Sequence, residues 1–169
     1  MVLRPFAVCV AFLMLTTGCG DGTKAVGTDP TSLLLASAAE KAVGDSGFNI
    51  PADIFVREAL YEDVMAVQYE GDPQFLSEAD KNALRSKFGD KAGLAFFSDP
   101  SVVVDSDGYL LPDRLVVLIG PLFETVEDGQ VMAVGVLAGS GLDNAYIGRY
   151  PVNLDTGEIG DSPRITMVP

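Results

Sequence analysis

Two apolar stretches decide the fold: Leu115–Phe123, which reads LVVLIGPLF, and Val131–Ala138, which reads VMAVGVLA. Both are rich in β-branched residues, and each is long enough for a strand. The seven residues between them include Asp128-Gly129, a pair typical of a hairpin turn. The sequence therefore predicts that the two stretches pair as antiparallel, central strands of a sheet.

Both stretches carry apolar side chains at odd and at even positions. In a sheet with one wet face, apolar and polar side chains alternate, so we expect both faces of this hairpin to be covered. Helices would cover one face. For the other face of strands 115–123 and 131–138, the alternatives are a further segment of the chain (residues 94–104 or the N-terminal helix), a partner subunit or a bound apolar ligand.

Upstream of the hairpin, three segments are predicted to be helices: residues 31–43, 52–67 and 77–88. Asp29 or Thr31 suits the start of the first helix, and Gly44 suits its end. Ser77 and Asp80 resemble a capping box at the start of the third. The apolar positions of the second segment approximate one helix face: Ile54, Val56, Leu60, Val64 and Val67.

Short apolar segments predict further strands at residues 94–97, 101–104, 146–154 and 159–168, the last interrupted by Pro163. Turns are expected at Asp105–Gly108 and Asp155–Glu158. Helices followed by an antiparallel β-meander make an α+β fold, here a single domain over residues 30–169. This element order, over residues 50–168, resembles that of cystatin-like and nuclear-transport-factor-like domains, which implies a curved sheet wrapped around helices.

The composition excludes several classes of function. The 169 residues include 24 acidic and 11 basic side chains, a net charge of −13, with no His and two Cys. Without His there is no Ser-His-Asp triad and no imidazole metal site. The negative charge argues against a nucleic-acid partner and favours a basic one. We expect no cofactor and no metal.

The N-terminus has the features of an export signal. Arg4 precedes an uncharged apolar run of eleven residues, Pro5–Leu15. This run is too short to span a membrane, which takes about 20 residues, and suits the core of a signal peptide. The sequence Leu15-Thr16-Thr17-Gly18-Cys19 follows directly. Residues 1–18 are therefore predicted to be a signal peptide, and the Gly-rich residues 19–29 a flexible tether.

Small residues before a Cys, directly after such a core, resemble the lipobox of bacterial lipoproteins. The resemblance implies cleavage before Cys19, lipid on its sulfur, palmitate or another acyl chain on the new amino terminus, and attachment to the cell envelope. Gly20 implies the outer membrane where two membranes are present. Thr16 departs from the pattern, which usually has Leu there. The alternatives are an ordinary cleaved signal with an unrelated Cys, and an uncleaved anchor.

Two acidic motifs suggest chemistry but fit turns better. Asp155-Thr156-Gly157 resembles the aspartic-protease signature, but there is one copy and few residues follow it. Asp105-Ser106-Asp107-Gly108 suggests a calcium loop, but with Gly108 at the sixth position the first and twelfth positions are not acidic. A weak surface calcium site of Asp105, Asp107 and Asp113 stays open.

Two further candidates are weaker. Glu58, Glu62 and Asp63 could supply paired carboxylates for glycoside hydrolysis, although such clusters are usually solvated helix faces. Gly139-Ser140-Gly141 lacks the Lys and the helix of a phosphate loop, so it predicts the end of a strand or a bulge.

The sequence thus favours a lipid-anchored, non-enzymatic envelope protein that acts by binding or assembly. Its partners would be the membrane, through lipid on Cys19, and a basic envelope protein or a second copy of itself. The alternatives are a carrier of a small apolar ligand in a sheet-lined pocket and a hydrolase that uses carboxylates alone.

Overall fold

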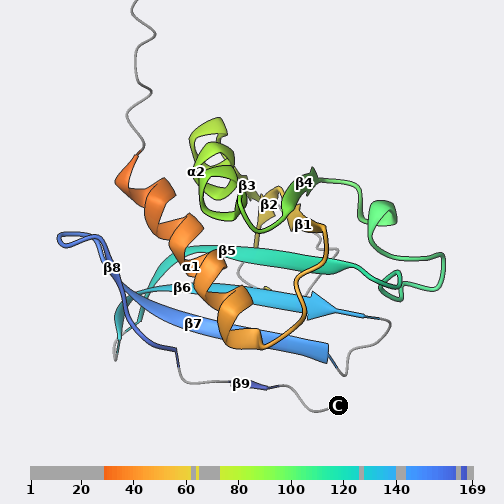
Figure 1. The fold of residues 1–169 in the computed structure, drawn as a ribbon. Coiled ribbons are helices and arrows are strands. Elements are labelled where there is room, and N and C mark those ends of the chain that lie inside the picture. The colour runs from red at the N-terminus through yellow and green to blue at the C-terminus, as the bar shows by residue number, and fades with distance from the viewer. Residues whose placement is uncertain are drawn as a thin grey trace, which may run out of the picture.

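The computed structural model describes residues 29–61, 64, 73–125, 128–139, 144–162 and 165–166. The predicted signal peptide, Cys19, nearly all of the tether and Pro163 lie outside these residues. Within the described part the fold is α+β, with two helices packed on one face of a mostly antiparallel, seven-stranded sheet (Figure 1). No helix among the described residues is both long and apolar enough to cross a membrane.

The helices are α1 (Pro30–Ser46) and α2 (Glu78–Phe88), with a short 3-10 helix at Pro100–Val102. The sheet has the order β4-β1-β5-β6-β7-β8, and β9 also pairs with β7. Its strands are β1 (Asp53–Arg57), β4 (Gly93–Phe97), β5 (Leu115–Thr125), β6 (Gly129–Ala138), β7 (Ala145–Asn153), β8 (Glu158–Ile159) and β9 (Ile165–Thr166). The strands β2 (Ala59–Leu60) and β3 (Gln74–Phe75) form a separate two-stranded ladder.

The predicted central hairpin is confirmed. β5 and β6 pair antiparallel, with Val117 opposite Val136 and Thr125 opposite Gly129. Gly129 has φ +67°, a left-handed conformation that favours glycine and that the Asp-Gly pair predicts. The register shifts between Ile119 and Leu122, where a bulge is expected to bend the strand.

The helix predicted over residues 52–67 is wrong, because its first part forms β1 and β2. β1 is parallel to both of its neighbours, β4 and β5, so the antiparallel meander holds only from β5 onward. Ile54 and Val56, alternate residues of β1, are fully buried. The same apolar positions fit a period of two as well as a helical period, and pairing with two strands decides between them.

Two smaller predictions also fail. Residues 101–104 are not a strand: Asp99 accepts a hydrogen bond from the Ser101 amide and Pro100 starts a 3-10 helix. The first helix does not end at Gly44 but continues to Ser46, and Gly47 closes it with φ +71°. A helix can pass through Gly44 because α1 gains its stability from packing rather than from propensity alone.

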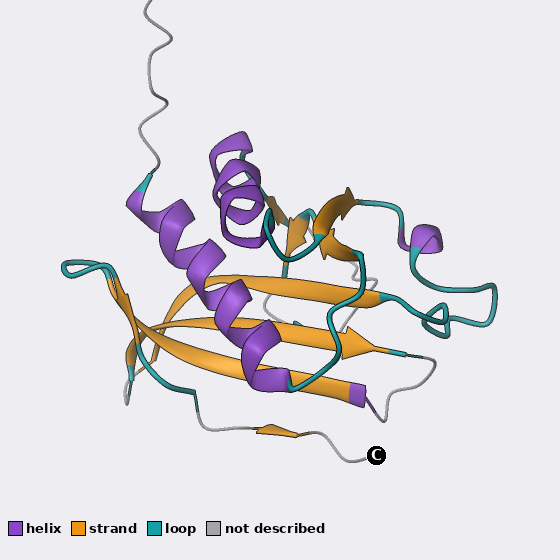
Figure 2. Ribbon diagram, in the orientation of Figure 1, coloured by secondary structure: helices purple, strands orange, loops and turns teal. Residues whose placement is uncertain are grey.

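The capping of both helices agrees with the sequence. Asp29 accepts a hydrogen bond from Thr31 at the start of α1. At the start of α2, Ser77 and Asp80 form the predicted capping box in both directions. The buried sides of α1, which contact α2 and the sheet, carry small, fully buried side chains: Ala36, Ala38, Ala39 and Ala42. Their size lets α1 lie close against β5, β6 and β7 (Figure 2).

The second face of the hairpin is covered by the chain itself. Val116 and Leu118 of β5 have no exposed surface. They belong to a separate apolar cluster with Phe97, at the end of β4, and Val103, which follows the 3-10 helix. One of the covers weighed from the sequence, residues 94–104, therefore supplies two of its members. The cluster also includes Val64, from a segment taken for helix.

Two glycines let Val64 lie directly on this face. A Cβ at position 135 would lie 2.7 Å from the carbonyl oxygen of Val64, and one at position 120 would lie 3.0 Å from the Val64 side chain. Because real Cβ atoms do not approach so closely, any larger residue at Gly135 must push the main chain of Val64 away. The absence of a side chain at 135 is therefore a packing requirement.

We predict that Gly135→Ala lowers the free energy of unfolding by about 1–3 kcal/mol, because the methyl group overpacks against main chain that cannot rotate away. Gly44→Ala is the matched control: a Cβ there meets nothing within 4 Å. That change should be neutral or stabilise the helix by up to about 1 kcal/mol. Urea midpoints measure both, and equal midpoints for the two variants would contradict this packing.

Both faces of β5 should be intolerant of charge. Val116→Asp and Val117→Asp each place a carboxylate at a position with no exposed surface. Each should cost about 3–5 kcal/mol, the range for a buried charge without a partner. Val102→Asp is the control, since Val102 is 43% exposed and its change should stay within about 0.5 kcal/mol. If Val116→Asp alone left the free energy of unfolding unchanged, the second face of the sheet would be open to solvent.

Candidate functional site

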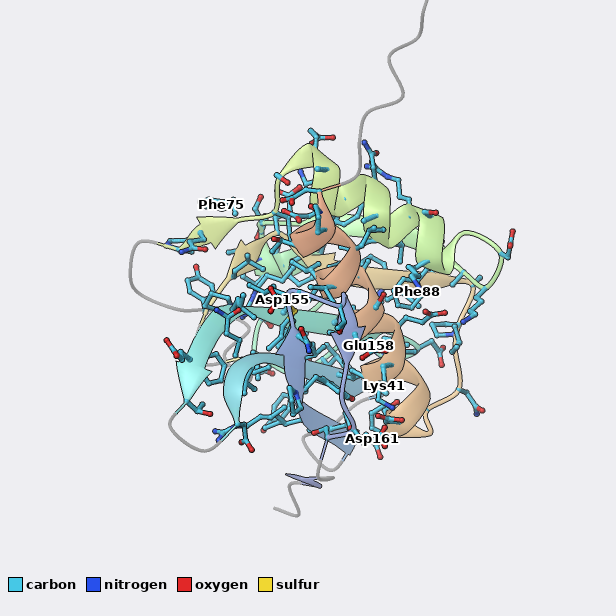
Figure 3. The ribbon with its side chains drawn as sticks, turned by 90° about the vertical axis from the view of Figure 1, so that its left-hand side faces the viewer. Lys41, Phe75, Phe88, Asp155, Glu158 and Asp161 are labelled. Carbon is cyan, nitrogen blue, oxygen red and sulfur yellow. The ribbon has the colours of Figure 1, made fainter. Side chains whose placement is uncertain are left out.

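The aspartic-protease-like motif is a turn, as the sequence favoured. Asp155, Thr156 and Gly157 connect β7 to β8. The side chain of Asn153 accepts hydrogen bonds from the amides of Asp155 and Thr156 at 3.0 and 3.1 Å, and Gly157 has φ +72°. Asp155 is exposed in this turn (Figure 3). Asp155 is therefore a residue of an exposed turn and not half of a buried carboxylate pair.

The calcium candidate is also organised as a turn. The Asp105 carboxylate accepts hydrogen bonds from the amides of Asp107 and Tyr109, at 3.0 and 2.9 Å. Asp113 has φ +59°, a backbone conformation that Asp tolerates better than most residues. Within the described residues, no three Asp, Glu, His or Cys side chains gather where they could hold a metal ion. The arrangement gives the calcium hypothesis no support.

The remaining sequence candidates lie partly outside the described residues. Glu58 follows β1 and forms an ion pair of 2.8 Å with Lys81 of α2, which accounts for its charge. The other members of its proposed cluster, Glu62 and Asp63, are not described. Gly139 ends β6 with φ +79°, as a strand end predicts, while Ser140 and Gly141 lie outside the described residues. Cys19, the predicted lipidation site, lies outside them as well.

The structure shows a polar network that sequence motifs did not indicate. Tyr146 and Tyr150 point to the same face of β7, and both are buried. The ring of Tyr150 folds back over Gly148, where a Cβ would lie 2.5 Å from its hydroxyl oxygen. This fold brings the two hydroxyl groups to 2.9 Å, and the Tyr150 hydroxyl donates a hydrogen bond of 3.1 Å to Asp45 of α1.

The network continues to the surface through ions. The Lys41 ammonium group lies 3.6 Å from Asp45 on α1 and 2.9 Å from Asp161, which follows β8 (Figure 3). These side chains line a hollow of about 290 Å³ together with Tyr146 and Ser162. The outer ion pair between Lys41 and Asp161 is exposed and so adds little to stability, whereas the hydrogen bond between the two tyrosines is buried.

The pKa directions show what this network can do. Burial, followed by the hydrogen bond with Tyr146, raises the pKa of Tyr150 far above its ordinary value. The hydrogen bond to Asp161 raises the pKa of Lys41. Tyr150 therefore stays a neutral donor and Lys41 stays charged at physiological pH, so neither acts as a base or nucleophile. The network can fasten α1 to β7, and the hydrogen-bonding and charged groups of its members largely pair with one another.

A weak signal for this network exists in the sequence. In the segment Tyr146-Ile147-Gly148-Arg149-Tyr150, the two tyrosines and the glycine share one face of a strand. A glycine between two aromatic residues on one face leaves room for a ring to fold over it. Asp45 is 105 residues away along the chain, so no local pattern could have added the third member.

Comparisons with known proteins assign no family to this chain. No family model matches the chain, and comparisons with curated proteins and with solved structures found no match. The similarity of element order to cystatin-like and nuclear-transport-factor-like domains therefore stays a prediction from the sequence.

We predict that Tyr150→Phe lowers the free energy of unfolding by about 1–3 kcal/mol, because it removes the hydrogen-bond partner of the buried Tyr146 hydroxyl and the bond to Asp45. The variant should also change the pH dependence. In the unfolded chain a tyrosine ionises near pH 10, while folded Tyr150 keeps its proton, so its stability contribution is complete below about pH 10 and is lost as pH rises further.

Unfolding in urea at a series of pH values from neutral to alkaline measures both effects. Tyr150→Phe should lose stability less steeply above about pH 10 than the unchanged protein. Tyr109→Phe serves as the control because Tyr109 is 62% exposed, and its curve should follow the unchanged protein. Parallel alkaline curves for all three proteins would contradict the shifted titration of Tyr150.

Proposed function

We propose that this chain is a lipid-anchored protein of the bacterial cell envelope that acts by binding or assembly and catalyses no reaction. The observation that carries the proposal is the apolar run Pro5–Leu15 followed directly by Thr16-Thr17-Gly18-Cys19. Lipid on Cys19 would attach the protein to the membrane, and Gly20 favours the outer membrane where there are two.

The described domain is suited to such an attachment. α1 begins at Pro30, eleven residues after Cys19, so the intervening residues would span at most about 40 Å when extended. The first helix is fastened to β7 through Asp45 and the buried tyrosines. A tether that ends in α1 would therefore hold the whole sheet and not a loosely attached helix.

The side-chain arrangement favours binding over catalysis. The Asp105 carboxylate supports a turn, Asp155 lies exposed in another turn, Glu58 pairs with Lys81, and Tyr150 is held neutral. The carrier alternative began from the double-sided apolar hairpin, and its second face is buried by Phe97, Val103 and other residues of the same chain. That observation therefore no longer calls for a ligand.

Changing the lipid attachment site tests the proposal. In a bacterial host, the unchanged protein should partition with membranes and carry lipid on Cys19. Cys19→Ala should abolish the lipid and either release the protein or leave an unprocessed precursor. Intact mass and membrane fractionation measure the two effects.

Cys9→Ala is the matched control, because Cys9 lies in the segment expected to be removed and its change should leave the mature mass unaltered. An unmodified Cys19 in the mature, unchanged protein would overturn the proposal. Fractionation to the inner membrane of a two-membrane host would contradict only the sorting inferred from Gly20.

A further inference from the structure

A groove lies where the β5–β6 turn meets the β7–β8 turn. It is lined by residues 128–130 from the first turn, and by residues 151–155 and 158–160 from the second. The pairing of β6 with β7, in which Val131 stands opposite Pro151, brings the two turns side by side. The volume of the groove is about 870 Å³, against about 290 Å³ for the hollow beside the tyrosines. The groove is therefore a separate concave surface of a size that can hold a ligand.

Part of the groove is apolar. Leu154 lines it and is 43% exposed, although large apolar side chains are mostly buried in the described residues. Pro151 and Ile159 line it as well and are half-buried, and Ile159 packs against the core beneath the helices. An apolar side chain of a ligand would remove this surface from water, which favours binding.

The charges of the groove are all negative. Asp128, Asp155 and Glu158 line it and are exposed, the last two on the β7–β8 turn (Figure 3). The Glu158 carboxylate accepts one hydrogen bond within its own turn, at 3.1 Å. No described side chain pairs with the carboxylates of the other two, and none of the described residues that line the groove is basic. These charges thus differ from Asp161, which pairs with Lys41.

A hydrogen-bond acceptor in the wall of the groove is a separate observation. The side-chain oxygen of Gln130 is buried and has no donor among the described residues. A buried acceptor without a donor costs free energy, which a new donor would recover. Because Gln130 is half-buried and lines the groove, a rotation of its side chain would offer this oxygen to an N–H group there. The acceptor and the carboxylates therefore favour the same kind of ligand, one that carries N–H donors and positive charge.

From the apolar lining, the unpaired carboxylates and the Gln130 acceptor, we infer that this groove binds a basic, partly apolar segment of a partner protein. Lys or Arg side chains of that segment meet the carboxylates, and an apolar side chain lies against Leu154 and Ile159. The net charge of −13 would draw such a segment toward the protein. The inference deepens the proposed function, since it rests on binding as the mode of action and names the surface and the chemistry of the partner.

Binding of a labelled peptide tests the inference. The probe is a blocked peptide of the sequence Lys-Leu-Lys-Leu-Lys, and fluorescence anisotropy measures its Kd for the protein as purified from its bacterial host, in a neutral detergent. Saturable binding that weakens as salt is added is expected. The triple variant Asp128→Asn, Asp155→Asn and Glu158→Gln should raise the Kd on the order of tenfold, because each exposed charge contributes little and three are removed.

The matched control neutralises three exposed carboxylates outside the groove: Asp53→Asn, Asp90→Asn and Asp107→Asn. It changes the net charge by the same amount, so its Kd should stay within about twofold of the unchanged protein. The apolar part of the inference has its own arm: Leu154→Ser, or a probe with Ser in place of Leu, should each raise the Kd several-fold. Urea midpoints show that every variant is folded.

Equal losses in the two triple variants would overturn the inference, because net charge alone would then explain the binding. Equal affinity for spermidine, or for the serine probe, would show that charge suffices and would overturn the choice of a protein segment. An absence of saturable binding would overturn the site and leave the lipid attachment standing. Because binding is measured whether or not Cys19 carries lipid, an unmodified Cys19 would overturn the anchoring alone.

Discussion

The rest of the structure depends on the burial of both faces of the β5–β6 hairpin. Val116 and Val117 are neighbours that point to opposite faces, and neither has any exposed surface. Burying apolar area is the main favourable term in folding, so two covers are required. The alanine-lined α1 and α2 provide one cover. Irregular chain provides part of the other, and Gly120 and Gly135 let the main chain at Val64 lie against the sheet.

The elements that could be predicted from the sequence are those with strong local signals. Asp128-Gly129 specifies the hairpin turn, and Ser77 with Asp80 specifies the start of α2. β1 was missed because Ile54 and Val56 fit a helix as well as a strand. Whether these residues form a helix or a strand is decided by β4 and β5. These strands come about 40 and 60 residues later and pair with β1 in parallel. A parallel pairing leaves no turn signal between the strands it joins.

At the candidate site, too, features with a local sequence signal could be predicted and those formed by distant residues could not. Asp and Gly residues that suggested catalysis or metal binding proved to be turn residues, because the features that suit a reactive loop also suit a tight turn. The tyrosine network escaped prediction since its members come from α1, β7 and the segment after β8. A motif search finds groups that are close in sequence, whereas burial of Tyr150 beside Asp45 depends on the packing of α1 on the sheet.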